Sequence, residues 1–158
     1  EVTFTLTDEN EIVIEYFAVS DKDTVCNLTN HAYFNIGGQD TVLGHELFIK
    51  SRQITPVDEE LIPHGEFMDI EGTPYSFYPA KLLGKDMFSD AKFIKACNGY
   101  DFNYCLERET AHELEHFAFV YDPETGRKMD CYTTLPALQL YTGSTISKCG
   151  SSIFVRLL

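Results

Sequence analysis

Residues 27 to 38 read Asn27-Leu28-Thr29-Asn30-His31-Ala32-Tyr33-Phe34-Asn35-Ile36-Gly37-Gly38. One histidine stands between small polar residues and two aromatic residues, and the stretch ends in a pair of glycines. This order is typical of a strand that brings a titratable group to a concave face and then turns away. Imidazole titrates near neutral pH, so His31 is a candidate acid or base. The alternative is a half-buried histidine that is hydrogen-bonded within a sheet.

The segments on both sides of this stretch predict a chain built almost wholly of β-strands. β-Branched and aromatic residues recur between short turns, which is the pattern of closely spaced strands. We expect a hairpin within residues 1–20, a strand from Thr24 into the histidine stretch, a short helix within 82–89, and strands at 46–54, 100–107, 114–122, 128–134 and 137–141. No internal repeat or linker interrupts this pattern, which predicts an all-β sandwich.

The composition argues against several classes of protein. With 44% hydrophobic and 13% aromatic residues, the chain is expected to fold around a core. A net charge of −13 without a Lys/Arg cluster predicts no nucleic-acid partner. We expect no signal peptide and no membrane span, because no apolar run is long enough. Five cysteines without a CxxC pair favour reduced thiols and a cytoplasmic protein.

Further segments match a known family in the same order along the chain. They are Leu43-Gly44-His45-Glu46-Leu47, Thr55-Pro56-Val57-Asp58, Ile62-Pro63-His64-Gly65-Glu66, Gly99-Tyr100-Asp101-Phe102-Asn103-Tyr104, residues 122–127 with 132–134, and Gln139-Leu140-Tyr141-Thr142-Gly143. With residues 27–38 they resemble the galactose mutarotase (aldose 1-epimerase) family over about residues 1–143. The resemblance implies a mutarotase-like supersandwich. It also implies an isomerase of carbohydrate metabolism that interconverts the α and β anomers of aldohexoses such as galactose and glucose.

The same resemblance implies roles for four residues. His31 matches the general acid that protonates the ring oxygen of the sugar, and Tyr33 lies on the loop that lines the pocket. Asp101 matches a carboxylate that holds sugar hydroxyls, and Gln139 matches a hydroxyl-binding amide. Two alternatives stay open: Asp101 stabilises a turn, or Gln139 occupies an exposed strand position. The reaction needs only proton transfers, so we expect a small aldose as partner, no metal and no cofactor.

The sequence departs from the family at its end. In mutarotases the general base is a Glu that lies beyond the strand matching Gln139 to Gly143. Residues 144–158 contain no carboxylate, so this base is missing from the chain. We therefore expect residues 1–143 to be a partial aldose 1-epimerase domain, a truncated sandwich from a longer protein, and residues 144–158 to be an atypical tail. The fragment alone is then expected to be catalytically incomplete.

Two other functions remain alternatives. One is a non-catalytic carbohydrate-binding β-sandwich that holds a sugar through Tyr33, Tyr100, Asp101 and Gln139. The remote alternative is a zinc protease, because His112-Glu113-Leu114-Glu115-His116 satisfies the HExxH pattern. That chemistry needs both histidines on one face of a helix, whereas positions four apart on a strand lie about 13 Å from each other. The β-type residues after His116 favour an exposed, charged strand end.

Overall fold

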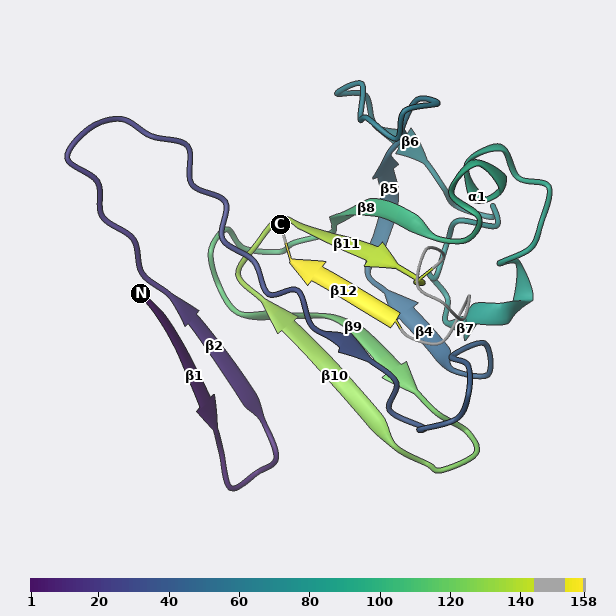
Figure 1. Ribbon diagram of the computed structural model, residues 1–158, viewed down its shortest axis with the longest axis horizontal. Coiled ribbons are helices and arrows are strands. Elements are labelled where there is room, and N and C mark those ends of the chain that lie inside the picture. The colour runs from purple at the N-terminus through teal and green to yellow at the C-terminus, as the bar shows by residue number, and fades with distance from the viewer. Residues whose placement is uncertain (144–152, 158) are drawn as a thin grey trace.

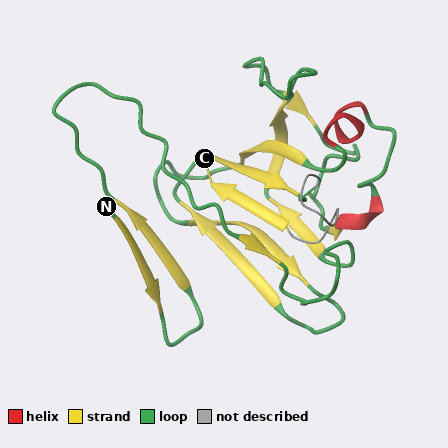
Figure 2. Ribbon diagram, in the orientation of Figure 1, coloured by secondary structure: helices red, strands yellow, loops and turns green. Residues whose placement is uncertain are grey.

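A computed structural model describes residues 1–143 and the backbone of residues 153–157 (Figures 1 and 2). Strands make up most of the regular secondary structure. They are β1 (Val2–Leu6), β2 (Ile12–Tyr16), β3 (Tyr33–Phe34), β4 (Glu46–Ile49), β5 (Ser51–Thr55), β6 (Met68–Asp69), β7 (Lys81–Leu82), β8 (Asp101–Leu106), β9 (Glu115–Tyr121), β10 (Lys128–Thr133), β11 (Ala137–Tyr141) and β12 (Ile153–Leu157). The helical segments in this part of the chain are the 3-10 turn η1 (Leu83–Lys85) and α1 (Lys92–Cys97).

Two sheets form the body of the molecule. The six-stranded sheet has the order β3-β12-β11-β8-β5-β6, and the four-stranded sheet has the order β10-β9-β4-β7. Neighbouring strands pair antiparallel in both. Buried side chains from the two sheets join one hydrophobic cluster, which is the arrangement of two packed layers. The predicted all-β sandwich is confirmed.

The alternation of side chains along each strand turns one face of each sheet toward the core. In β8, Phe102 and Tyr104 are fully buried, whereas Asp101 and Asn103 point to the other side and stay partly exposed. β11 repeats this alternation. Each large apolar side chain removed from water in this way stabilises the fold by ~1.5–3 kcal/mol. The six-stranded sheet therefore has an apolar inner face and a polar outer face.

Aromatic rings fill the centre of the core, and their polar atoms have partners. The rings of Phe77 and Tyr100 meet edge to face, with centroids 4.9 Å apart. The Tyr104 hydroxyl donates a hydrogen bond to the carbonyl of Tyr75 at 2.7 Å, and the Tyr100 hydroxyl donates one to the carbonyl of Pro74 at 3.0 Å. Burial raises the pKa of both tyrosines, so the two hydroxyls stay protonated donors. Large rings are thus buried without leaving unpaired hydroxyls.

The first two strands form a separate hairpin that stands apart from the body (Figure 1). β1 and β2 pair with each other from Val2↔Tyr16 to Leu6↔Ile12, and they make up a sheet of their own. Large apolar side chains on it remain open to solvent, such as Phe4 at 62% and Leu6 at 78% exposure. The hairpin predicted within residues 1–20 is confirmed, but it packs on neither layer of the sandwich.

The prediction of a single strand over residues 46–54 is wrong in one respect. The structure has two strands there. β4 ends at Ile49 and lies in the four-stranded sheet, while β5 begins at Ser51 and lies in the six-stranded sheet. The backbone of Lys50 makes the crossing: its N–H donates to the carbonyl of Phe117 and its carbonyl accepts from the N–H of Glu107. Continuous β-type sequence cannot reveal that the chain changes layers here.

Two further expectations differ from the structure. Residues 24–32 are not a strand, and Val25 is 98% exposed there because no neighbouring strand pairs with the segment. Within residues 82–89 only the turn η1 is helical. The helix α1 comes later and ends at Cys97, with Asn98 as its left-handed C-cap. A helix of six residues is too short to produce a clear apolar periodicity in sequence.

The predicted boundary between a domain and a tail stays a prediction. Residues 144–152 and residue 158 lie outside the described residues. Residues 153–157 form β12, which pairs on one side with β11 and on the other with β3. This part of the chain is therefore a strand of the six-stranded sheet, placed between the two strands that hold Tyr33 and Gln139.

Candidate active site

The histidine stretch is shaped by its own asparagine side chains. Asn30 accepts a hydrogen bond from the N–H of Ala32 through Oδ1 at 2.9 Å, just beside His31. Asn35 closes the following turn, because its Oδ1 accepts from the N–H of Gly38 at 3.1 Å and its Nδ2 donates to the carbonyl of Gln39 at 2.7 Å. Asparagine favours such local bonds over a regular ladder. The stretch is therefore a short strand between two side-chain-stabilised bends.

A second set of contacts fastens this stretch to the turn between β9 and β10. Gln39 Nε2 donates to Asp122 Oδ2 at 3.1 Å, and Arg127 Nη1 donates to the carbonyl of Ile36 at 3.2 Å. Asp122 also accepts from the hydroxyl of Thr125 at 2.5 Å. These donors lower the pKa of Asp122 to about 2, with the Thr125 hydroxyl as the largest cause. An ionised Asp122 thus joins the loop after β3 to the four-stranded sheet.

Gly37 leaves the space that this junction needs. A Cβ at this position would lie 2.6 Å from Asp122 Oδ2 and closer still to Gln39 Oε1. Real Cβ atoms do not approach other heavy atoms that closely. Gly37, the first glycine of the pair that ends the histidine stretch, therefore leaves room for the side chains of Gln39 and Asp122, which would have to shift to accept a Cβ.

Asp101 and Gln139 lie together on the outer face of the six-stranded sheet. Gln139 Nε2 donates to Asp101 Oδ1 at 2.6 Å between the neighbouring strands β11 and β8. Both side chains are half-buried, and burial raises the pKa of Asp101, while the bond from Gln139 opposes this shift. Such a pair presents hydrogen-bond acceptors and an amide to a polar ligand. The structure thus brings together two residues that the sequence places 38 positions apart.

The start of β8 is locked to the end of β11. The N–H of Tyr100 donates to Thr142 Oγ1 at 3.0 Å, and the N–H of Thr142 donates to the carbonyl of Tyr100 at 3.0 Å. Gly99 makes this approach possible, because it has a φ of +136° and its Cβ would lie 2.7 Å from Thr142 Oγ1. This lock fixes the register that sets Asp101 opposite Tyr141.

Tyr33 lies on β3, an edge strand of the same sheet, and His31 lies just before that strand. Their rings are 5.5 Å apart, and the ring of Tyr33 meets that of Tyr141 edge to face at 6.3 Å. Since Tyr141 is the register partner of Asp101, the aromatic rings connect the histidine stretch to the Asp101–Gln139 pair. All four residues singled out from the sequence thus lie on or beside the six-stranded sheet. The roles assigned to them stay predictions.

Two residues of this face were missed in the sequence. Tyr141 contacts Tyr33, and Asn103 lies between Gln139 and Thr55, with its Nδ2 donating to Thr55 Oγ1 at 3.2 Å. The signal was the period of two residues, because Asn103 follows Asp101 and Tyr141 follows Gln139 at that spacing. Asn103 Oδ1 is buried without a hydrogen-bond partner.

The HExxH pattern does not form a metal site in the structure. His116 lies on β9, His112 lies before that strand with a φ of +67°, and no helix contains them. His116 Nε2 instead contacts Asp130 Oδ1 at 3.0 Å. Among the described residues, no group of three or more His, Cys, Asp or Glu side chains could hold a metal ion. The strand predicted over 114–122 is confirmed, and the zinc-protease alternative is not supported.

In the part of the chain that the structure describes, no helix could span a membrane. The helical segments there are too short to cross a bilayer.

Comparison with known proteins identifies relatives along nearly the whole chain. The sequence profile of the aldose 1-epimerase family matches residues 1–154. Galactose mutarotase of Sus scrofa is 40% identical over 145 residues, which is 90% of this chain and 40% of the relative. Aldose 1-epimerase of Escherichia coli (strain K12) is 37% identical over 144 residues, which is 90% of this chain and 41% of the relative.

A solved structure matches the fold. A GalM/aldose epimerase homologue from C. elegans superimposes with a TM-score of 0.85 at 24% identity, covering 99% of this chain and 49% of that chain. The fold and the polar face together define a mutarotase-like β-sandwich. The chain belongs to the aldose 1-epimerase family, because the profile of that family covers residues 1–154. It spans about two fifths of the length of the curated relatives it matches.

Proposed function

We propose that the polar face of the six-stranded sheet serves the interconversion of α and β anomers of aldohexoses such as galactose and glucose. The observation that carries this proposal is the convergence of four side chains from three segments on one sheet: His31, Tyr33, Asp101 and Gln139. Membership of the aldose 1-epimerase family supports it. The relatives named galactose mutarotase and aldose 1-epimerase point to the same reaction.

The chemistry of these groups suits ring opening by proton transfer. His31 is proposed as the acid that protonates the ring oxygen, so that the bond from that oxygen to C1 breaks and the hydroxyl at C1 becomes a carbonyl. An imidazole side chain can both give and regain a proton, which suits this role. Rotation about the bond from C1 to C2 and reclosure then yield the other anomer. A positioned acid of this kind contributes ~10²–10⁴-fold.

The remaining residues of the face are proposed to hold the sugar. Asp101 offers carboxylate oxygens to two hydroxyls, and Gln139 offers an amide that can both donate and accept. Tyr33 is proposed to cover the apolar side of the ring. The proton on the C1 hydroxyl also needs an acceptor, and residues 144–158 supply no carboxylate for that role. The proposal therefore assigns this chain the acid and the hydroxyl-binding groups.

We further propose a cytoplasmic setting without a nucleic-acid partner. Cys26, Cys97, Cys105 and Cys131 are unpaired, which fits a reducing compartment. A net charge of −13 disfavours contact with a phosphate backbone.

Polarimetry of freshly dissolved α-galactose tests the proposed reaction. Solvent water takes the proton of the C1 hydroxyl in place of the missing carboxylate, so the chain is expected to accelerate mutarotation only weakly. His31→Ala is expected to abolish this added rate, because it removes the proton donor. His64→Ala is the matched control, since His64 is exposed in the loop before β6. Circular dichroism establishes that each variant is folded.

Equal acceleration by the chain and by folded His31→Ala would contradict the assignment of the acid. Sugar binding by a folded chain without any acceleration would contradict the proposed reaction, and would favour a carbohydrate-binding role for the same face.

A further inference from the structure

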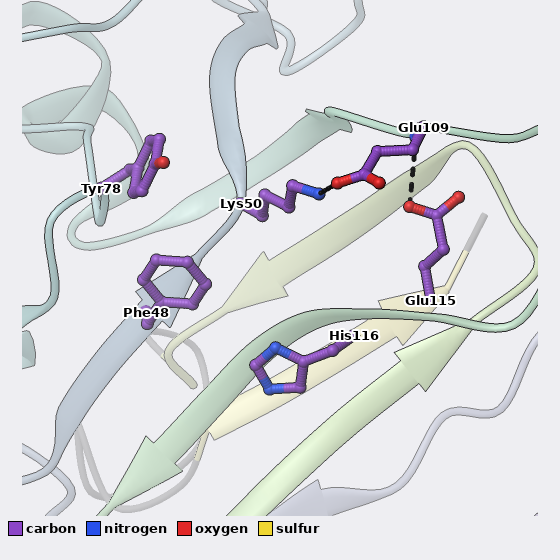
Figure 3. A pocket seen from close by; sticks show the side chains of 6 residues that line it. All are labelled: Phe48, Lys50, Tyr78, Glu109, Glu115 and His116. Atoms are coloured by element: carbon purple, nitrogen blue, oxygen red, sulfur yellow. Dashed lines mark hydrogen bonds and ion pairs between the residues drawn. The ribbon is translucent and has the colours of Figure 1, made fainter.

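A groove lies on the outer face of the four-stranded sheet, away from the candidate active site. It is a shallow groove, open to solvent, with a volume of about 400 Å³, and it is lined by Phe48, Lys50, Tyr78, Glu109, Glu115 and His116 (Figure 3). Its volume falls within the ~300–1,000 Å³ that small-molecule sites occupy. The lining residues come from β4, β9 and the segments next to them, and none of them belongs to the site described above.

One side of the groove is aromatic. Phe48 stacks on Phe119 with parallel rings and centroids 5.3 Å apart, because the two residues face each other across β4 and β9. Phe48 also meets Tyr78 edge to face at 5.4 Å and lies parallel to the imidazole of His116 at 6.3 Å. Arg52 covers one face of Tyr78 at 5.3 Å from its centroid. The rings are thus held in place by one another before any ligand arrives.

The other side of the groove is charged, and its charges are balanced within the protein. Lys50 Nζ lies 3.2 Å from Glu109 Oε1 (Figure 3). Glu115 accepts hydrogen bonds from the N–H groups of Glu109 and Thr110, and these bonds are the main reason that its pKa is lowered. Arg108 adds a guanidinium 3.5 Å from Glu115. The groove therefore offers fixed donors and acceptors without a surplus of either charge.

We propose that this groove is a binding site for a neutral pyranose ring, as a monosaccharide unit or the end of a glycan. A pyranose has flat C–H faces that pack on aromatic rings and equatorial hydroxyls that need donors and acceptors at its edge. The aromatic and charged sides of the groove supply these two kinds of contact on opposite walls. The proposal uses different residues from the proposed function and does not depend on it.

The charged side chains around the groove disfavour both anionic and cationic ligands. A phosphate or carboxylate would need an unpaired cation, but Lys50 is committed to Glu109 and Arg108 lies against Glu115. An organic cation beside the rings would be repelled by Arg52, which lies over Tyr78, and by Lys128, which lies 4.8 Å from the centroid of the Phe119 ring. A neutral ligand with many hydroxyls meets neither obstacle.

The test is a titration of the full chain with methyl β-glucopyranoside, followed by amide shifts in ¹H–¹⁵N NMR spectra. This glycoside is blocked at C1, so binding is observed without anomer interconversion. We expect shifts at Lys50, Glu109 and His116, and weaker association in Tyr78→Ala by roughly 2- to 10-fold, because an aromatic contact is lost. Glu109→Gln, at a side chain 83% exposed, should weaken binding without risk to the fold.

Two controls define the outcome. Phe67→Ala removes an aromatic ring that is 67% exposed elsewhere and should leave the groove shifts unchanged. Sorbitol has similar hydroxyls but no ring face, and should produce no groove shifts. The proposal is overturned if sorbitol acts like the glycoside or if Tyr78→Ala binds unchanged. It is also overturned if the groove amides respond only to protein concentration, which would mean that a second copy of the chain occupies the face.

The same variants separate this site from the proposed function. Tyr78→Ala should keep any acceleration of mutarotation, since the ring of Tyr78 packs on Phe48 of the four-stranded sheet. We expect His31→Ala to lose the acceleration of mutarotation but to keep the amide shifts of the groove residues on titration with the glycoside. That result would show that the two sites are independent.

Discussion

Asp101 is one residue through which pH is expected to affect the candidate active site. Burial raises its pKa above the ordinary value for an aspartate, although the hydrogen bond from Gln139 acts against this shift. Its carboxyl therefore begins to take up a proton at a higher pH than an exposed aspartate does. A protonated carboxyl accepts fewer hydrogen bonds, so its hold on sugar hydroxyls should weaken in mild acid.

Replacing this carboxylate tests that link. For Asp101→Asn we expect kcat/KM for α-galactose to fall roughly 10- to 100-fold, because a hydrogen bond to a charged group contributes ~1.5–3 kcal/mol. The KM of the unaltered chain should rise as the pH is lowered toward the pKa of Asp101. The KM of the variant should stay level across about pH 4 to pH 8. Polarimetry at several pH values measures both.

The matched control for this change is Asp69→Asn on β6. Asp69 is exposed in the same sheet and accepts from Gln53 Nε2 at 2.9 Å, so its loss should leave KM unchanged. If Asp101→Asn kept the pH dependence of the unaltered chain, another group would be responsible for it.

Only some residues of the candidate site could be identified from the sequence alone. Residues with distinctive chemistry, such as His31 and Asp101, can be singled out from the chain alone because few residue types serve as acids or carboxylate ligands. Asn103 and Tyr141 were not singled out, because the period of two residues places them on the same face as Asp101 and Gln139 but does not distinguish them from ordinary strand residues. Their place in the site follows from the register of β8 on β11, which depends on contacts between distant segments.

At the scale of elements, the loop after β3 depends on the absence of a side chain at Gly37. We expect Gly37→Ala to lower the free energy of unfolding by ~1–3 kcal/mol, because its Cβ would press on Asp122 and Gln39. The displaced loop should also lower the mutarotation rate through His31. Urea unfolding and polarimetry measure the two effects.

Gly44→Ala provides the comparison, since a Cβ there meets nothing within 4 Å. It should change the free energy of unfolding by less than about 0.5 kcal/mol. Equal stability of the two variants would mean that the junction adapts to a methyl group.

The turn between β9 and β10 should make the fold sensitive to acid. The pKa of Asp122 is lowered from 3.8 to about 2, so its ionised form is stabilised in the folded state. This stabilisation is present above pH 3.8 and is lost as the pH falls through about 2. Urea midpoints of the unaltered chain should therefore fall across that interval, and Asp122→Asn should remove part of the slope.

Asp90→Asn serves as the control for that experiment, because the Asp90 side chain is 95% exposed and pairs only at the surface with Lys95. It should keep the full slope of the unaltered chain. A slope in Asp122→Asn as steep as in Asp90→Asn would contradict the assignment to this turn.

The observed bounds of the strands show what the sequence pattern can and cannot predict. The strands β9, β10 and β11 were predicted within one residue of their bounds, because each has turn residues on both sides. The segment around Lys50 lacks such turn residues, so the sequence did not predict that the chain passes from one sheet to the other there. Alternation predicts which side chains of a strand are buried, but it does not say which sheet buries them.

At the scale of the whole molecule, the hairpin β1–β2 and the sandwich should differ in stability. The hairpin forms its own two-stranded sheet, and the side chains of β1 are exposed. A two-stranded hairpin is marginally stable in water by itself. We expect the amides of β1 and β2 to exchange with deuterium well before those of β9 and β10, which also form a hairpin but bury side chains in the core.

Hydrogen-exchange mass spectrometry at neutral pH compares the two hairpins within one sample. Similar protection of both would show that β1–β2 is held by contacts in solution beyond those of its own ladder.

The position of β12 in the sequence affects the order in which strands of the six-stranded sheet can pair during translation. Phe34 pairs with Ile153, so about 120 residues of chain separate the two partners. At ~5–20 residues per second, translation leaves β3 without its sheet neighbour for roughly 6–24 s. During that interval β8, β9, β10 and β11 can already pair with one another. The edge that holds His31 is therefore the last part of the large sheet to be assembled.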